Sequence, residues 1–405
     1  IMTMKKIMSW TKGLEDPKTP LLGPTLKGLY IFGLWQTGSR LRTVTYNIIH
    51  SLTLVFVVTQ FVDLYIVRHN IILVLNNMSL AGLSTVCFAK CYSYVAWQNQ
   101  WRELAKMMSE EELLQIKTQD RQVIKYMEQY IKYSRMVTYV YWMLVFSTNL
   151  FMIVKPFFKY ASKTYRADIK EGLEPYPQIM CSWFPFDKTK MPGYLGALFF
   201  HVAMSIQGSG VLAAYDANAI AILCYLKGHM TMLKAKCEGI FDDVSSTHVA
   251  LDKIRECHRH HSVLLKQHKL FGSLLSPTMF QYVLLCSITI CCGVVQFGSK
   301  DVTIYQKVWI VEFTTGLVAQ LLLYCWHCNE VAIETQNVDR KVYESKWWRG
   351  DVRVRRQLLL LAGKLNHPLV LKAGPYTTLS LQTFIDIMKG SYSFYTLFSQ
   401  MQEDN

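Results

Sequence analysis

Seven apolar blocks, each long enough to cross a lipid bilayer as a helix, divide this sequence. They cover residues 43–67, 71–97, 136–158, 193–226, 274–299, 308–329 and 373–399. Because a helix rises about 1.5 Å per residue, roughly twenty residues span the ~30 Å hydrocarbon core. Only helices and closed barrels pair all their backbone groups in lipid, and these blocks lack the alternation of barrel strands. The sequence therefore predicts an all-α integral membrane protein with seven transmembrane helices.

The distribution of Lys and Arg predicts the orientation of these helices. The segments that would be cytoplasmic if the N-terminus is inside, 1–42, 98–135, 227–275 and 330–364, hold 30 Lys and Arg, whereas the opposite segments hold 10. Cytoplasmic loops carry such an excess, so we expect a cytoplasmic N-terminus and, with seven spans, an extracellular C-terminus. The same scatter argues against nucleic-acid binding despite the net charge of +14, because nucleic-acid binders gather basic residues on one face of a soluble domain.

The last block, 373–399, is more polar than the others. It contains Asp386, Lys389 and many Ser and Thr residues. Ionisable residues inside a membrane usually face a bundle interior or a water-filled path, and this pair lies at the spacing of helix neighbours. Two interpretations remain open at this point: a helix buried at the centre of a single bundle, or a helix that lines a pore.

The chain shows no credible catalytic or metal-binding set. Cys325-Trp-His-Cys328 has redox or metal spacing, but it lies at the end of an apolar block without a second pair nearby. Cys257-His-Arg-His-His261 is more typical of an ordinary cytoplasmic helix than of a metal site. We find no phosphate loop, G-x-S-x-G or H-E-x-x-H. We therefore expect no enzyme activity, no metal and no cofactor.

A ligand pocket is expected in the outer halves of the second, third, fourth and sixth blocks, where bulky apolar residues mix with a few polar ones. A mostly apolar cavity with few polar groups suits a small, oily ligand, although ordinary helix packing uses the same residue types. The candidate ligand-binding residues are Asn76, Met78, Ser79, Phe146, Asn149, Leu150, Ile153, His201, Met204, Ser205, Trp309 and Phe313.

Several motifs resemble the insect odorant receptor family. They are Trp347-Trp348, Arg355-Arg356 with the Leu run that follows, Asn366-His-Pro368, the stretch from Leu379 to Phe384, Ser391-Tyr-Ser-Phe-Tyr-Thr-Leu-Phe398, and Trp183-Phe-Pro-Phe-Asp187 between the third and fourth blocks. The C-terminal motifs span about sixty residues and are fairly specific; elsewhere the resemblance lies mainly in length and layout.

The resemblance implies an odorant-gated, nonselective cation channel in the plasma membrane of a sensory neuron. It implies a heterotetramer with the odorant co-receptor, a small volatile ligand and contact with membrane lipid. The candidate pocket offers no pair of opposite charges, which suggests a small, largely apolar ligand such as an ester, alcohol or terpenoid. The family's last helix lines the pore, and its motif register places the outer constriction near Tyr395, Phe398 and Ser399.

On this basis the chain divides into four parts. They are a cytoplasmic N-terminal segment (1–42), six transmembrane helices with the odorant pocket (43–329), cytoplasmic anchor helices (330–372), and a pore-lining helix with an extracellular tail (373–405). A gustatory receptor shares the expected fold, but its terminal motif prefers Thr where this chain has Ser391. A transporter would be expected to show internal repeats, which we do not find. A G-protein-coupled receptor would need the opposite orientation.

Overall fold

The structure is a computed structural model that describes residues 11–161, 163–242, 246–298, 304–366 and 368–403. Nearly all of its regular structure is helical. In chain order the elements are η1 (Thr11–Leu14), α2 (Gly23–Ile31), α3 (Arg40–Ile66), α4 (Ile71–Ala96), α5 (Gln98–Lys117), α6 (Arg121–Tyr160), α7 (Lys163–Lys170), α8 (Gly193–Glu238), η2 (Gly239–Phe241), α9 (Thr247–Gly298), α10 (Ile304–Thr335), α11 (Val338–Glu344), η3 (Trp347–Arg349), α12 (Val352–Leu365), β1 (Lys372–Ala373), β2 (Thr377–Thr378) and α13 (Leu381–Glu403).

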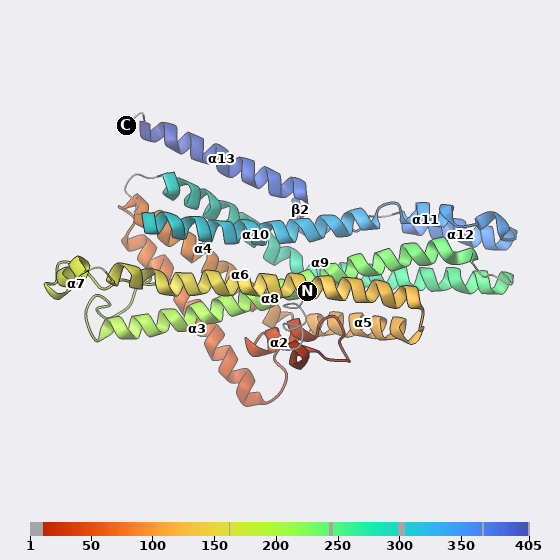
Figure 1. Cartoon of the computed structure of the whole chain (residues 1–405), viewed down its shortest axis with the longest axis horizontal. Helices are drawn as coiled ribbons and strands as arrows, with labels where there is room; N and C mark the ends of the chain where they lie inside the picture. Colours follow the sequence, from red (N-terminus) through yellow and green to blue (C-terminus); the bar gives the residue numbers. More distant parts are fainter. Residues whose placement is uncertain (1–10, 162, 243–245, 299–303, 367, 404–405) are drawn as a thin grey trace.

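Long helices run along the molecule, with α8 at the centre (Figure 1). Helix α8 packs against α6, α10, α4, α9 and α2, and its middle is almost entirely buried. Ala217, Ala219 and Ala221 have no exposed surface there. Small residues of this kind allow neighbouring helices to approach closely in a membrane protein, which explains why the buried middle of α8 is rich in alanine.

Five of the described helices are long and apolar enough to cross a membrane. They lie within Arg40–Ile66, Arg121–Phe158, Gly193–Phe241, Thr247–Gly298 and Gln306–Glu344. Each contains, or nearly contains, one of the blocks that the sequence predicts. Helices α4 and α13 are not among these five; within them lie Lys90 and the pair Asp386 and Lys389, respectively. The predicted all-α, multi-span architecture is confirmed.

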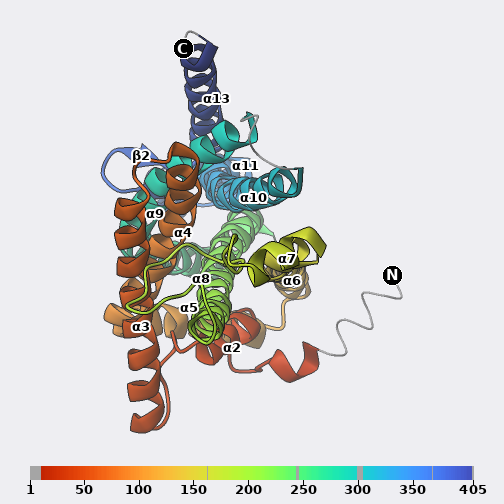
Figure 2. The same ribbon diagram turned by 90° about the vertical axis from the view of Figure 1, so that its left-hand side faces the viewer.

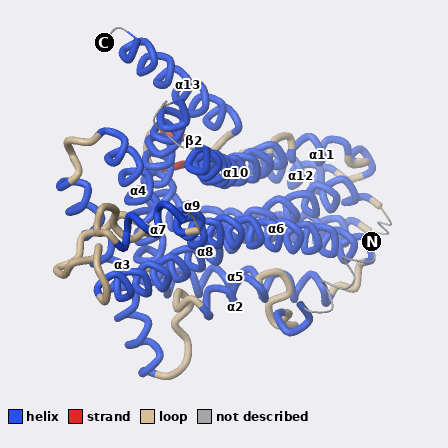
Figure 3. The backbone as a smooth tube through the Cα atoms, turned by 60° about the vertical axis from the view of Figure 1, so that its left-hand side comes forward, coloured by secondary structure: helices blue, strands red, loops and turns tan. Residues whose placement is uncertain are grey.

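The last helix starts later than predicted. Residues 373–380 do not continue a helix, because β1 and β2 form a small antiparallel hairpin in which Lys372 pairs with Thr378 (Figure 3). Gly374 turns the chain with a φ of +66°, a conformation that costs glycine little. Its backbone N–H also donates to Ser276 Oγ at 2.9 Å, which fixes the turn against α9. Helix α13 therefore begins at Leu381.

Helix α13 stands apart from the rest of the bundle (Figures 1 and 2). It contacts α9 and α10, while Tyr392, Phe394 and Leu397 are exposed. The bundle has two distinct ends. Helices α5, α11 and α12 gather at one, which we call the α12 end, and α7 lies at the other, the α7 end (Figure 1).

Candidate functional site: an apolar pocket among four helices

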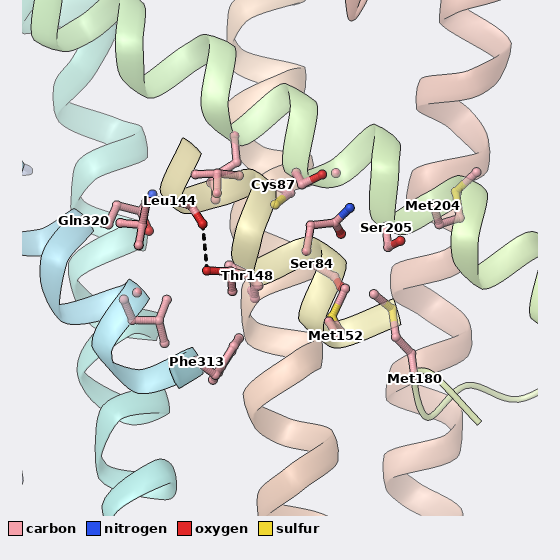
Figure 4. Close-up of a pocket in the computed structure, with 18 of the residues that line it drawn as sticks. Ser84, Cys87, Leu144, Thr148, Met152, Met180, Met204, Ser205, Phe313 and Gln320 are labelled. Atoms are coloured by element: carbon pink, nitrogen blue, oxygen red, sulfur yellow. Dashed lines mark hydrogen bonds between the residues drawn. The ribbon is translucent and has the colours of Figure 1, made fainter. Parts of the chain in front are cut away.

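A cavity of about 110 Å³ lies among α4, α6, α8 and α10. Helix α3 contributes Phe56, and the segment 171–192 between α7 and α8 contributes Met180 (Figure 4). Most of its surface is apolar. The remaining lining residues include Leu83, Ser84, Cys87, Tyr141, Leu144, Thr148, Asn149, Met152, Met204, Ser205, Gly208, Phe313, Leu317 and Gln320. Mostly apolar cavities with a few polar groups are typical small-molecule sites.

The two ends of this pocket differ in chemistry. Met152, Met180 and Met204 lie toward one end, and Gln320 lies at the other (Figure 4). Methionine side chains are unbranched and polarisable, so they adapt to ligands of different shape. The methionine end can therefore adjust to a ligand, whereas the Gln320 end is held by hydrogen bonds.

Asp216 on α8 organises the Gln320 end. Its Oδ1 accepts from Lys90 Nζ and Tyr324 Oη, both at 2.5 Å. Its Oδ2 accepts from Tyr141 Oη at 2.7 Å and Gln320 Nε2 at 2.5 Å. A carboxylate offers about four lone-pair positions, so the acceptor capacity of Asp216 is filled. These contacts join α4, α6, α8 and α10 beneath the pocket.

Lys90 and Asp216 form an ion pair in which neither side chain is exposed. Tyr282 of α9 lies beside Lys90, with the ammonium 4.7 Å from the ring centroid. A buried charge is tolerated only when it is paired and hydrogen-bonded. The sequence analysis noted Lys90 only as an interruption of a block and did not single out Asp216. The sequence feature that could have predicted this ion pair is the presence of opposite charges inside two different apolar blocks.

The segment 171–192 covers the α7 end of the pocket. Ser182 Oγ lies 2.6 Å from His201 Nε2 on α8. Lys188 Nζ donates to Asp63 Oδ1 on α3 at 3.1 Å, and the Trp183 backbone N–H donates to the Thr59 carbonyl. These contacts hold the segment that carries Met180 against the pocket.

Four of the twelve candidate ligand residues line the cavity: Asn149, Met204, Ser205 and Phe313. Three others face the outside of the bundle: Phe146 and Leu150 are 62% and 49% exposed, and Met78 is 37% exposed. The difference follows the helical repeat, because the face of α6 that carries Asn149 and Thr148 points inward while Phe146 lies on another face.

The remaining five candidates do not line the cavity but contact other residues. Trp309 stacks on Phe313 with ring centroids 5.1 Å apart. His201 contacts Ser182, Asn76 donates to Cys181, and Ser79 accepts from Gln296. Ile153 packs against the core. A direct ligand role for these residues stays a prediction.

Of the predicted pore residues, only the side chain of Tyr395 falls within the described structure. A Cβ at Gly298, the last residue of α9, would lie 2.9 Å from Tyr395 Cε2. Tyr395 therefore packs closely on α9. The side chains of Phe398 and Ser399 lie outside the described residues, so the predicted constriction is untested there.

Comparison with known proteins identifies the family. Residues 70–392 match the family model described as 7tm Odorant receptor. Odorant receptor 46a, isoform B, of Drosophila melanogaster is 23% identical over 219 residues, covering 51% of this chain and 56% of that receptor. Odorant receptor 49a of the same species is 21% identical over 341 residues, covering 80% and 84%. For several other odorant receptors of Drosophila melanogaster, the match spans less than two thirds of the receptor's length.

A solved structure shows the same fold. The insect olfactory receptor OR5 from Machilis hrabei, determined in complex with eugenol, superposes with a TM-score of 0.75 at 15% identity, covering 93% of this chain and 97% of that one. This chain belongs to the insect odorant receptor family. It is a multi-pass membrane protein of a receptor family, not an enzyme.

Proposed function

We propose that this chain is an odorant-binding subunit of a ligand-gated, nonselective cation channel. It would assemble with odorant co-receptor subunits in a heterotetramer in the plasma membrane of a sensory neuron, in contact with membrane lipid. Seven transmembrane helices, with a cytoplasmic N-terminus and an extracellular C-terminus, would place the α7 end outside and the α12 end inside. The 30 to 10 distribution of Lys and Arg supports this orientation.

The apolar pocket among α4, α6, α8 and α10 is the observation that carries the proposal. It is lined mainly by apolar side chains, and the nearby charges of Lys90 and Asp216 neutralise each other. Such a site favours a small, largely apolar volatile over an ion or a charged metabolite. In the related fold of the Machilis hrabei receptor OR5, eugenol is the bound molecule.

The packing provides a physical route from the pocket to α13, the proposed pore helix. Phe313 and Gln320 of α10 line the cavity, and both α10 and α9 contact α13. An odorant that binds the open arrangement more tightly than the closed one shifts the population toward opening. A tenfold difference in affinity, about 1.4 kcal/mol, gives a tenfold change in that equilibrium.

Whole-cell current recording tests this function. The chain is expressed alone and with the co-receptor, and both sets of cells receive a panel of volatiles. We expect an odorant-evoked, weakly selective cation current only when both subunits are present. A current from this chain alone would contradict the obligate partnership, and silence in both, with surface expression confirmed, would contradict the proposed channel function.

A further inference from the structure

The carboxamide of Gln320 is held in one orientation at the end of the pocket. Its Nε2 donates to Asp216 Oδ2 at 2.5 Å, and the residue is only 3% exposed. Turning the amide over would place Gln320 Oε1 against the carboxylate oxygen, and two acceptors cannot share a hydrogen bond. The negative charge of Asp216 therefore selects the amide nitrogen and directs Oε1 away from itself.

The other amide atom is left for a ligand. Gln320 lines the cavity, and its Oε1 accepts no hydrogen bond among the described residues. Asp216 cannot compete for a ligand hydroxyl, because Lys90, Tyr141, Tyr324 and Gln320 already fill its four acceptor positions. The Gln320 end thus presents a fixed hydrogen-bond acceptor.

We infer that Gln320 makes this receptor selective for odorants that donate a hydrogen bond, namely alcohols and phenols, over isomeric ethers, ketones and esters. The inference rests on the proposed odorant-binding function. A hydroxyl of the ligand donates to Gln320 Oε1 while its hydrocarbon part extends toward Met152, Met180 and Met204. An ether oxygen in the same place meets another acceptor and leaves Oε1 unpaired.

The amide of Asn149, unlike that of Gln320, is not held in one orientation. It also lines the cavity, and its buried Oδ1 has no hydrogen-bond partner among the described residues. No hydrogen bond to a carboxylate in the described part of the chain fixes the orientation of this amide, so it can turn its nitrogen or its oxygen toward a ligand. Asn149 therefore contributes polarity without discriminating donors from acceptors, whereas Gln320 discriminates because Asp216 fixes it.

Isomeric ligand pairs test the inference. Benzyl alcohol is compared with anisole, and hexanol with methyl pentyl ether, so that size and composition stay constant within each pair. Concentration–response curves are recorded from the complex of this chain with the co-receptor. A neutral hydrogen bond in a buried site corresponds to roughly a tenfold change in affinity. We expect each alcohol to be about tenfold more potent than its ether.

Two variants separate the Gln320 oxygen from other effects. Gln320→Met, which keeps the approximate volume, should reduce the alcohol-to-ether potency ratio to about one. Asn149→Leu should shift both members of a pair together and so preserve the ratio. An unchanged ratio in Gln320→Met, or an equal loss of the ratio in Asn149→Leu, would overturn the inference.

The outcome is separable from the proposed channel function. If the complex gives no current with any volatile, the channel proposal fails, and ligand-induced thermal stabilisation of the purified chain still measures the alcohol-to-ether preference. If Gln320→Met does not reach the surface, the same measurement on the unmodified chain decides: stabilisation by alcohols over their ethers supports the inference, and equal stabilisation overturns it.

Discussion

Lys90 Nζ lies 2.5 Å from Asp216 Oδ1, and the two side chains have no exposed surface. The residues come from α4 and α8, and three more polar side chains complete the shell around the carboxylate. Removing one charge leaves the other buried without its partner, which is far more costly than the pair itself.

Lys90→Met should therefore destabilise the protein strongly. Breaking a buried pair on one side costs about 3–5 kcal/mol, and we expect a fall in thermal unfolding temperature of more than about 5 °C in detergent. Lys106→Met is the matched control, because the Lys106–Glu110 pair is exposed on both sides and exposed pairs contribute little. Equal unfolding temperatures for the two variants would show that the buried pair is not a stabilising requirement.

Gly208 sets the size of the pocket. It lines the cavity, and a Cβ at this position would meet no atom within 4 Å. Gly208→Val should fill part of the ligand space without displacing the backbone, lowering the potency of long odorants by about tenfold or more relative to short homologues. Dose–response curves across a homologous series measure this change. Gly363→Val, on α12 and equally unobstructed, should leave the size preference unaltered; a parallel change there would point to a general loss of function.

At the α12 end, Glu112 links the N-terminal segment to the bundle. Its Oε2 accepts from the Leu21 backbone N–H at 3.3 Å and its Oε1 accepts from Tyr130 Oη at 2.7 Å. Burial raises the pKa of Glu112 to about 7, whereas an unfolded glutamate titrates near 4.3. A carboxyl group with a raised pKa contributes stability that is present below its unfolded pKa and is lost as pH rises through the folded value.

Comparing the wild type with Glu112→Gln isolates this contribution. Between pH 6 and 8 the wild type should lose about 1 kcal/mol relative to the variant, which we would measure as a difference in thermal unfolding temperature. Comparing the two proteins is necessary because neighbouring histidines change the stability in the opposite direction as pH rises. Burial lowers the pKa of His260 to about 3 and also lowers that of His229. Parallel pH profiles for the two proteins would contradict a titrating Glu112. Arg135 and Tyr130 also face the Glu112 carboxyl.

Tyr395 should act on the pore. It packs against Gly298 at the end of α9, and we expect Tyr395→Ala to change conductance or ion selectivity more than odorant sensitivity. Substitutions at Asn149 or His201 should do the reverse. Reversal potentials in mixed cation solutions, recorded beside odorant dose–response curves, distinguish the two. An unaltered permeation phenotype in Tyr395→Ala would contradict the register assigned to α13.

The sequence could predict helices but not which of their faces point inward. Block length and composition located the apolar parts of α3, α6, α8, α9 and α10, because bilayer thickness imposes a minimum length on each. Phe146 and Phe313 are chemically equivalent in sequence, yet one faces outward and the other lines the cavity. When both lipid and pocket are apolar, hydrophobicity cannot distinguish the two faces.

The polar part of the site was missed for a different reason. Asp216 is 126 residues from Lys90 and 104 from Gln320, and no periodicity links positions so far apart. Their association depends on how α4, α8 and α10 pack. The hairpin before α13 was also missed, because Gly374 and Pro375 were included in an apolar block although both residues favour a turn.

The pocket combines a fixed end at Gln320 with an adaptable end at Met152, Met180 and Met204. Exchanging a methionine alters the space for a hydrocarbon chain without touching the hydrogen bonds of Asp216. Descendants of this sequence could thus diversify in the chain lengths they detect while retaining the same functional group. Changing the functional group means replacing Gln320, whose contact with Asp216 is part of a network that joins four helices, so shifts in odour class should be rarer than shifts in odorant size.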